Sequence, residues 1–120
     1  MKNQIKEMLN LQDKINEKVH ADWKTQNFEW YRAIWVECAE LLDHHGWKWW
    51  KKQRPNRDQM LLELIDIWHF GLSSLLVKNS NAEMITACLT KELNIVWIPT
   101  IFVMTSRPLF ATRWEQRTLM

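Results

Sequence analysis

The chain has 120 residues but only two glycines and three prolines. A sandwich of many short strands needs more residues suited to tight turns, so this composition favours a few long helices. The formal net charge of +2 argues against a general binder of polyanions, and the length suits one domain.

Residues 2 to 19 form the first predicted helix, because apolar side chains such as Ile5 and Leu9 recur there at helical spacing. Gln12 and Asn16 lie one turn apart on the same stripe. Two amides on an inward face are either hydrogen-bonded internally or available to the polar edge of a ligand. The first ten residues contain no uninterrupted apolar run, which predicts a cytoplasmic chain without a signal peptide.

A second predicted helix runs from about Phe28 to His45 and stops at Gly46. The third begins after Pro55, with Asn56 as its capping residue, and continues to about residue 78. Residues 60 to 77 are apolar enough to suggest a membrane span. However, they contain two carboxylates, and each costs about 2.5–3.5 kcal/mol on insertion scales. We therefore predict a helix of the protein core.

The last predicted helix opens with Ser80 and Glu83 as a capping pair and reaches about Asn94. After Asn94 the chain becomes β-branched and apolar and shows no clean helical face. The predicted organisation is thus an all-α, four-helix domain over residues 1–94, followed by an irregular C-terminal tail over residues 95–120.

Two cysteines, Cys38 and Cys88, lie in apolar helical patterns and lack the spacing of metal ligands. We predict that both are buried, reduced thiols, which agrees with a cytoplasmic protein.

The strongest functional signal is a pair of acidic motifs, Glu37 with Glu40 and Glu63 with Asp66. A spacing of three residues places both carboxylates of each motif on one helix face. Both faces also carry apolar residues, where unpaired anions are costly, and neither carries Arg or Lys. A divalent cation such as Mg²⁺, or alternatively Mn²⁺, fits this all-oxygen set. A solvated acidic face is the structural alternative.

A basic aromatic loop separates the two acidic motifs. Cations beside a carboxylate-bound metal suit a polyphosphate, because the metal and the cations share its negative charge. The cations of this segment are Lys48, Lys51, Lys52, Arg54 and Arg57.

The motifs together resemble a known family, the dimeric all-α dUTPases. These belong to the MazG-like nucleoside triphosphate pyrophosphohydrolases, many of them encoded by bacteriophages. The resemblance covers residues 8 to 78 well and fades through the fourth helix. It rests on the run from Trp30 to Asp43 (WYRAIWVECAELLD), on Trp47 to Lys51 (WKWWK) and on Glu63 to Phe70 (ELIDIWHF).

The resemblance implies a homodimer that hydrolyses dUTP to dUMP and pyrophosphate by a metal-positioned water, and it leaves open whether dUDP is also cleaved. It implies Mg²⁺ bound by Glu37, Glu40, Glu63 and Asp66, with Glu37 as the base. Gln12 and Asn16 match an amide-bearing helix that reads uracil, and Trp49 matches an aromatic side chain that packs on the base. Lys48 and Lys51 complete the expected substrate contacts, whereas Trp35, Trp50 and Trp68 are expected in the core or the dimer interface.

One expected family feature is missing from this sequence. Longer members carry a Lys, Asn and Arg motif that grips the phosphates and deoxyribose, and no such motif follows Asn94. A shortened form that binds metal but turns over little substrate is therefore one alternative. A second subunit or the basic loop could also supply the missing cations.

Three other functions remain open at this stage. A broader MazG-like pyrophosphatase would accept other nucleoside triphosphates. A di-iron bundle needs two Glu-x-x-His pairs, and only Asp66 with His69 approximates one. A nucleic-acid-binding loop would use its Trp and Lys residues for stacking and neutralisation. We expect neither stable nucleic-acid binding nor membrane insertion.

Overall fold

The computed structural model describes residues 1–79 and 81–95, and within these residues every regular element is helical. The prediction of an all-α fold is therefore confirmed. The elements are α1 (Lys2–Val19), a short 3₁₀ turn η1 (Trp23–Thr25), α2 (Trp30–His45), α3 (Arg57–Lys78) and α4 (Ala82–Ile95).

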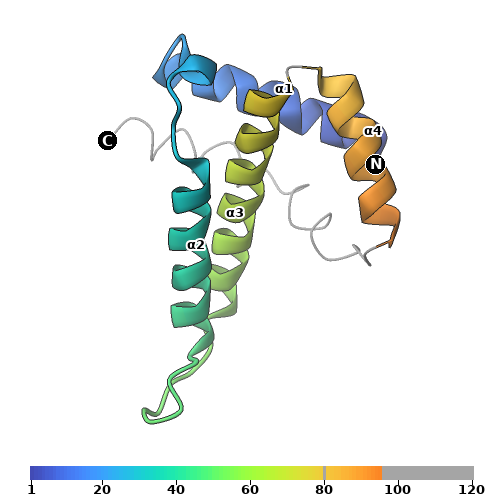
Figure 1. Cartoon of the computed structure of the whole chain (residues 1–120). Coiled ribbons are helices and arrows are strands. Elements are labelled where there is room, and N and C mark those ends of the chain that lie inside the picture. The colour runs from blue at the N-terminus through green and yellow to red at the C-terminus, as the bar shows by residue number, and fades with distance from the viewer. Residues whose placement is uncertain (80, 96–120) are drawn as a thin grey trace.

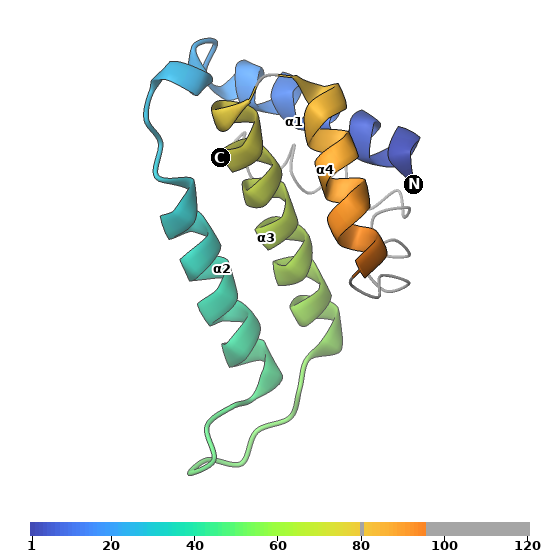
Figure 2. The same ribbon diagram turned by 45° about the vertical axis from the view of Figure 1, so that its right-hand side comes forward.

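Two long helices, α2 and α3, run antiparallel as a hairpin and make the most extensive contact in the fold. Figure 1 shows α1 lying across one end of this hairpin, while the loop that joins α2 to α3 projects at the other end. In Figure 2 α4 lies beside α3 and in front of α1. Helix α3 contacts all the other elements, so it is the central helix of the described fold.

The apolar core lies where α1, α3 and α4 meet. Ile5 and Leu9 of α1 are fully buried there, together with Leu72 and Leu76 of α3, and Trp68 packs against them. This burial confirms the apolar stripe predicted for the first helix. Trp68 is partly buried against the core, which is one of the two positions expected for it.

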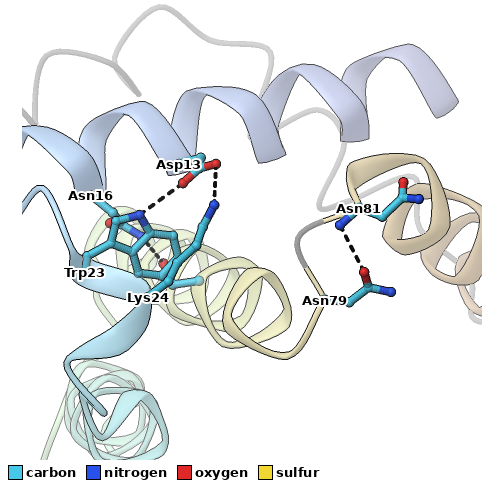
Figure 3. A network of polar contacts seen from close by, with 7 residues as sticks. Asp13, Asn16, Trp23, Lys24, Asn79 and Asn81 are labelled. Atoms are coloured by element: carbon cyan, nitrogen blue, oxygen red, sulfur yellow. Dashed lines mark hydrogen bonds and ion pairs between the residues drawn. The ribbon is translucent and has the colours of Figure 1, made fainter.

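Asp13 of α1 holds the short turn η1 in place (Figure 3). Its Oδ1 accepts a hydrogen bond from Trp23 Nε1 at 3.0 Å, and its Oδ2 pairs with Lys24 Nζ at 2.7 Å. Trp23 is almost fully buried. These two contacts of Asp13 fix the path of the chain between the end of α1 and the start of α2.

Helix ends agree closely with the sequence signals. Gly46 ends α2 with a φ of 80°, a conformation that suits glycine. The Asn56 side chain caps α3 by accepting from the Gln59 backbone N–H at 3.2 Å. At the start of α4 the cap is Asn81, whose side chain accepts from two backbone N–H groups, those of residues 83 and 84. The capping role predicted for Ser80 falls outside the described residues.

By length and composition, α3 could cross a membrane, and it is the single such helix among the described residues. The core helix of a soluble protein passes the same test. The central position of α3, with buried Glu63 and His69 on it, supports the interpretation as a core helix.

The prediction that the two cysteines are buried is wrong for this chain. Cys38 and Cys88 are free thiols, as predicted, but both are exposed. Trp35 and Trp50 are exposed, so they do not lie in the core, and their expected position in a dimer interface stays a prediction. The physical reason for Trp35 and Cys38 is that α2 packs mainly against α3, so the residues on its other faces have no neighbour within the described chain.

Candidate metal centre

Three of the four predicted carboxylates meet between α2 and α3. Glu37, Glu63 and Asp66 each offer one oxygen, and these oxygens all lie within 4.8 Å of one another. They meet because α2 and α3 are antiparallel and each acidic residue faces the neighbouring helix. The sequence predicted this pairing of motifs, and the structure brings these three residues together.

Burial makes the group chemically unusual. Glu63 is 1% exposed and Glu37 is 7% exposed, and Asp66 is half-buried. The Oε2 atoms of Glu37 and Glu63 are buried and have no hydrogen-bond partner. Buried carboxylate oxygens without a donor are costly, so a cation is the simplest group that would satisfy both.

The environment raises the pKa of Glu37 to about 8. Burial is the largest cause, followed by a hydrogen bond with Glu63 and by repulsion from the charges of Asp66, Glu40 and Glu63. Without a cation, the protein therefore holds a proton between these carboxylates at neutral pH. A divalent cation would take the place of that proton.

Glu40 differs from the prediction that it faces inward with Glu37. Its side chain is exposed and lies outside the group of three, although its charge acts on Glu37. Glu40 is displaced from the centre of the α2 face that packs on α3, so it flanks the group. Its role as a metal ligand remains a prediction.

His44 is a site residue that the sequence analysis missed. Its Nε2 lies 3.4 Å from Glu63 Oε1, and its backbone carbonyl accepts a hydrogen bond from the Asn56 N–H. His44 follows Glu37 by two turns on the same face of α2, so the spacing of seven residues was the available signal. By contrast, Arg32 pairs with Glu29 on the outside of α2.

The two predicted uracil-binding amides lie in a buried network between α1 and α3. Gln12 Nε2 donates to Asn16 Oδ1 at 3.0 Å, and Asn16 Nδ2 donates to Ser73 Oγ at 2.9 Å. Ser73 Oγ donates to the His69 carbonyl, and the His69 ring contacts Gln12 Oε1. Gln12 is fully buried and Asn16 is 5% exposed. The internally hydrogen-bonded alternative thus describes this chain, and the contact with uracil stays a prediction.

Burial lowers the pKa of His69 to about 3, so its ring is neutral at physiological pH. A neutral ring can accept or donate one hydrogen bond at each nitrogen according to its tautomer. The contact with Gln12 supports the interpretation of His69 as a satisfied core histidine.

The basic aromatic loop lies at the opposite end of the hairpin from α1 (Figures 1 and 2). Trp49 is 88% exposed there and meets Trp50 edge to face. Lys48 Nζ lies 3.2 Å from Asp43 Oδ1, while Lys51 is exposed. The structure therefore brings the loop residues together but does not place them beside Gln12 and Asn16.

Distance along α3 shows how far apart these groups are. Ser73 of the amide network and Arg57 at the start of α3 are 16 residues apart, which corresponds to about 24 Å along the helix. One uracil ring cannot contact both the amide network and Trp49 of the same chain at this separation. The carboxylates lie between the two.

The donor set fits Mg²⁺ or Mn²⁺. All the gathered ligands are carboxylate oxygens, which hard divalent cations prefer. The two buried oxygens without partners point to the same conclusion. A di-iron site would need two Glu-x-x-His motifs, and the acidic motifs on α2 and α3 offer only Asp66 with His69 as an approximation of one.

In a comparison with known protein families, residues 4–116 match a family model described as dUTPase. The match includes residues of every helix described above. It also extends past residue 78, where the resemblance inferred from the sequence motifs begins to fade. No curated protein and no solved structure matches the chain.

Proposed function

Because the chain belongs to the dUTPase family, we propose that it hydrolyses dUTP to dUMP and pyrophosphate in a Mg²⁺-dependent reaction. The observation that carries the proposal is the convergence of Glu37, Glu63 and Asp66 with two buried oxygens that lack partners. In the cell such an activity would keep uracil out of DNA. The expected setting is the cytoplasm, and a phage-encoded origin fits the resemblance.

In this proposal Glu37, Glu63 and Asp66 hold the cation, and Glu40 joins them from its exposed position. Bound Mg²⁺ would neutralise phosphate oxygens and position the attacking water. Glu37 is the proposed base, as the family resemblance implies, and its place between Glu63 and Asp66 supports that role. His44 holds Glu63 in place through their 3.4 Å contact.

The substrate contacts follow the family resemblance. Lys48 and Lys51 would neutralise the phosphates, and Trp49 would pack on the base. Gln12 and Asn16 would read uracil. Since Trp49 and the amides lie at opposite ends of one hairpin, both can act on one base only if two subunits of the proposed homodimer share each site.

The deciding experiment is to measure pyrophosphate release from dUTP with and without Mg²⁺, beside dTTP, dCTP, UTP and dUDP. We expect rapid release that depends on Mg²⁺ and strongly prefers dUTP. Glu63→Gln should abolish it, whereas Glu29→Gln, at an exposed acid that precedes α2, should not.

Other outcomes separate the alternatives. Comparable rates with all the nucleotides would identify a broader MazG-like pyrophosphatase instead. A Mg²⁺-induced rise in melting temperature without release from any nucleotide would identify a metal-binding form with little activity. No effect of Mg²⁺ on either measurement would contradict the metal centre itself.

A further inference from the structure

Three tryptophans lie together in the basic aromatic loop and remain open to solvent. Trp47 is 48% exposed, Trp49 is 88% exposed and Trp50 is 58% exposed. Trp47 and Trp49 each meet Trp50 edge to face, with ring centroids 5.3 Å apart. Each of these contacts covers one ring face at most, so wide aromatic faces stay uncovered. Soluble proteins rarely expose large apolar side chains next to one another unless the patch binds a partner.

The same loop holds a local excess of positive charge. Residues 47–57 contain five cations and no acid, which gives them a net charge of +5 and leaves −3 for the rest of the chain. The net charge of +2, which argues against a general binder of polyanions, hides this excess. Lys48 pairs with Asp43. The other four cations are exposed and pair with no acid among the described residues: Lys51, Lys52, Arg54 and Arg57.

Hydrogen bonds within the loop hold it in one shape. The Lys48 backbone N–H donates to Gln53 Oε1 at 2.8 Å, and the Lys51 N–H donates to the Lys48 carbonyl at 3.1 Å. At the base of the loop, the Asn56 N–H donates to the His44 carbonyl at 2.8 Å. A loop that is already ordered loses less conformational entropy when a ligand binds.

We propose that the basic aromatic loop, residues 47–57, binds single-stranded nucleic acid. Bases would stack on the tryptophans while the phosphates lie beside the exposed cations. A single strand offers uncovered base faces and a charged backbone together, whereas a duplex covers its base faces by stacking. The ligand is a polymer, and its contacts include Trp47, Trp50 and Lys52. The proposal therefore goes beyond hydrolysis of a free nucleotide.

The expected binding is weak and reversible. Proteins that hold nucleic acid mainly through phosphate contacts have dissociation constants of about 1–100 μM at physiological salt. Four cations on one short loop belong to this class, because they offer few contacts and no pattern that reads a base sequence. Such binding agrees with the expectation that the chain forms no stable complex with nucleic acid.

A membrane surface is the other ligand that tryptophan and lysine together suggest. The backbone of the loop argues against it. Residues 47–56 form neither helix nor strand, and most of their backbone N–H groups have no hydrogen-bond acceptor within the described protein. Water can stay on these groups beside a nucleic-acid strand, whereas the hydrocarbon of a bilayer would leave them unpaired.

The test is fluorescence anisotropy of a labelled oligothymidylate mixed with the full chain. EDTA is present, so that no metal bridges the carboxylates to the phosphates. We expect saturable binding at low salt. The logarithm of the dissociation constant should rise against the logarithm of the salt concentration with a slope of about 3, since each of four phosphate contacts contributes about 0.7. Oligouridylate measured beside it shows whether DNA or RNA binds more tightly, and a duplex of equal length should bind at least about fivefold more weakly.

The role of charge is tested by a double substitution. Lys52→Gln with Arg54→Gln should lower the salt slope by about 1.4, because two phosphate contacts are lost. Lys14→Gln with Lys18→Gln is the matched control. It removes the same charge from exposed positions on α1, which lies across the opposite end of the hairpin (Figure 1). We expect the control to keep the wild-type slope.

The role of stacking is tested at Trp50, which both other rings contact. Trp50→Ala should weaken binding of the oligothymidylate at least about fivefold, as expected for loss of one stacked base or more. Trp50→Phe keeps an aromatic face and should retain most of the affinity. Circular dichroism should show unchanged helix content in both variants, because Trp50 lies outside the helices.

Four results would overturn the proposal. They are no binding of either single strand at low salt, equal affinity for the duplex, equal loss of slope in the control pair, and unchanged binding by Trp50→Ala. Sedimentation with phosphatidylglycerol vesicles by a chain that binds no oligonucleotide would make a membrane the partner instead. Pyrophosphate release measured on the same samples keeps the two proposals apart. An inactive chain that binds the strands contradicts only the proposed hydrolysis, and an active chain that does not bind them contradicts only the proposed nucleic-acid site.

Discussion

Glu37 is the residue on which the electrostatics of the centre depend most. It is buried beside Glu63 and Asp66, and the charge of Glu40 adds to theirs. In the absence of a cation, burial and repulsion both disfavour the ionised form of Glu37. The cluster of carboxylates therefore lowers the stability of the metal-free protein.

Removing this charge should stabilise the metal-free protein. We expect Glu37→Gln to raise its free energy of unfolding at pH 8.5 by about 1–3 kcal/mol, since a shift of one pKa unit corresponds to about 1.4 kcal/mol. The same substitution should remove the rise in melting temperature that Mg²⁺ causes. Thermal unfolding with EDTA and with Mg²⁺ measures both effects. If Glu37→Gln were less stable in EDTA, the proposed repulsion would be wrong.

His69 and Glu37 give opposite dependences of stability on pH. The folded-state pKa of Glu37 is raised from 4.5 to about 8, so the folded protein retains a proton that the unfolded chain has lost. Stability from this group therefore falls as pH rises from 4.5 to 8. The folded-state pKa of His69 is lowered from 6.5 to about 3, so stability from His69 falls as pH drops below 6.5.

The acid side of this profile can be tested with His69→Gln. Because a neutral side chain cannot titrate, the loss of stability between pH 6 and pH 4 should become shallower by up to about 1.4 kcal/mol per pH unit. Denaturant unfolding at several pH values measures this slope, and the slope is independent of any constant cost of the substitution. An unchanged slope would show that the pKa of His69 does not differ between the folded and unfolded states.

At the scale of single residues, the sequence predicted what depends on local spacing and missed what depends on neighbours. The acidic motifs are readable because three residues make nearly one helical turn. The burial of Glu37 and the exposure of Glu40 could not be predicted, since both border the same apolar stripe. Only the crossing of α2 and α3 decides which of them lies inside.

At the scale of elements, two glycines have opposite roles. Gly46 ends α2 in the left-handed region, and a Cβ there would lie 2.9 Å from the Gln53 Cβ. Gly71 lies inside α3, and a Cβ there would meet nothing within 4 Å. The first glycine is needed for the start of the loop, whereas the second lowers helix stability.

Alanine substitutions at the two glycines should therefore change the stability of the protein in opposite directions. We expect Gly46→Ala to destabilise the protein by about 1–2 kcal/mol from the left-handed conformation alone, with a further cost from Gln53. Gly71→Ala should stabilise it by about 0.5–1 kcal/mol. Chemical denaturation of the two variants beside wild type measures the difference. Destabilisation by Gly71→Ala would indicate that this position must approach another chain closely.

Helix existence was predictable, and the orientation of α2 was not. Local signals such as Asn56 and Gly46 mark the helix ends. However, α2 carries apolar residues around most of its circumference, so its pattern could not separate the face that packs on α3 from the exposed face that carries Tyr31 and Trp35. The prediction that Cys38 is buried failed for that reason.

At the scale of the whole molecule, the arrangement separates the candidate functional groups along one axis. The buried amide network lies near α1, the carboxylates lie in the middle of the hairpin and the basic aromatic loop lies at its far end (Figure 1). The sequence predicted these groups individually. It could not predict their separation, because the distance between Gln12 and Trp49 depends on which end of the α2–α3 hairpin α1 packs against.

The carboxylates come from two consecutive helices joined by one short loop, and this has a consequence for how the protein folds. Contacts between neighbouring elements form early, because they close short loops of chain. The centre would thus assemble in the α2–α3 hairpin before α1 and α4 dock. Metal-free carboxylates would oppose that step, so we expect Mg²⁺ to accelerate refolding in stopped-flow measurements, beyond its effect on unfolding. If Mg²⁺ slowed only unfolding, the centre would instead form after the rate-limiting step.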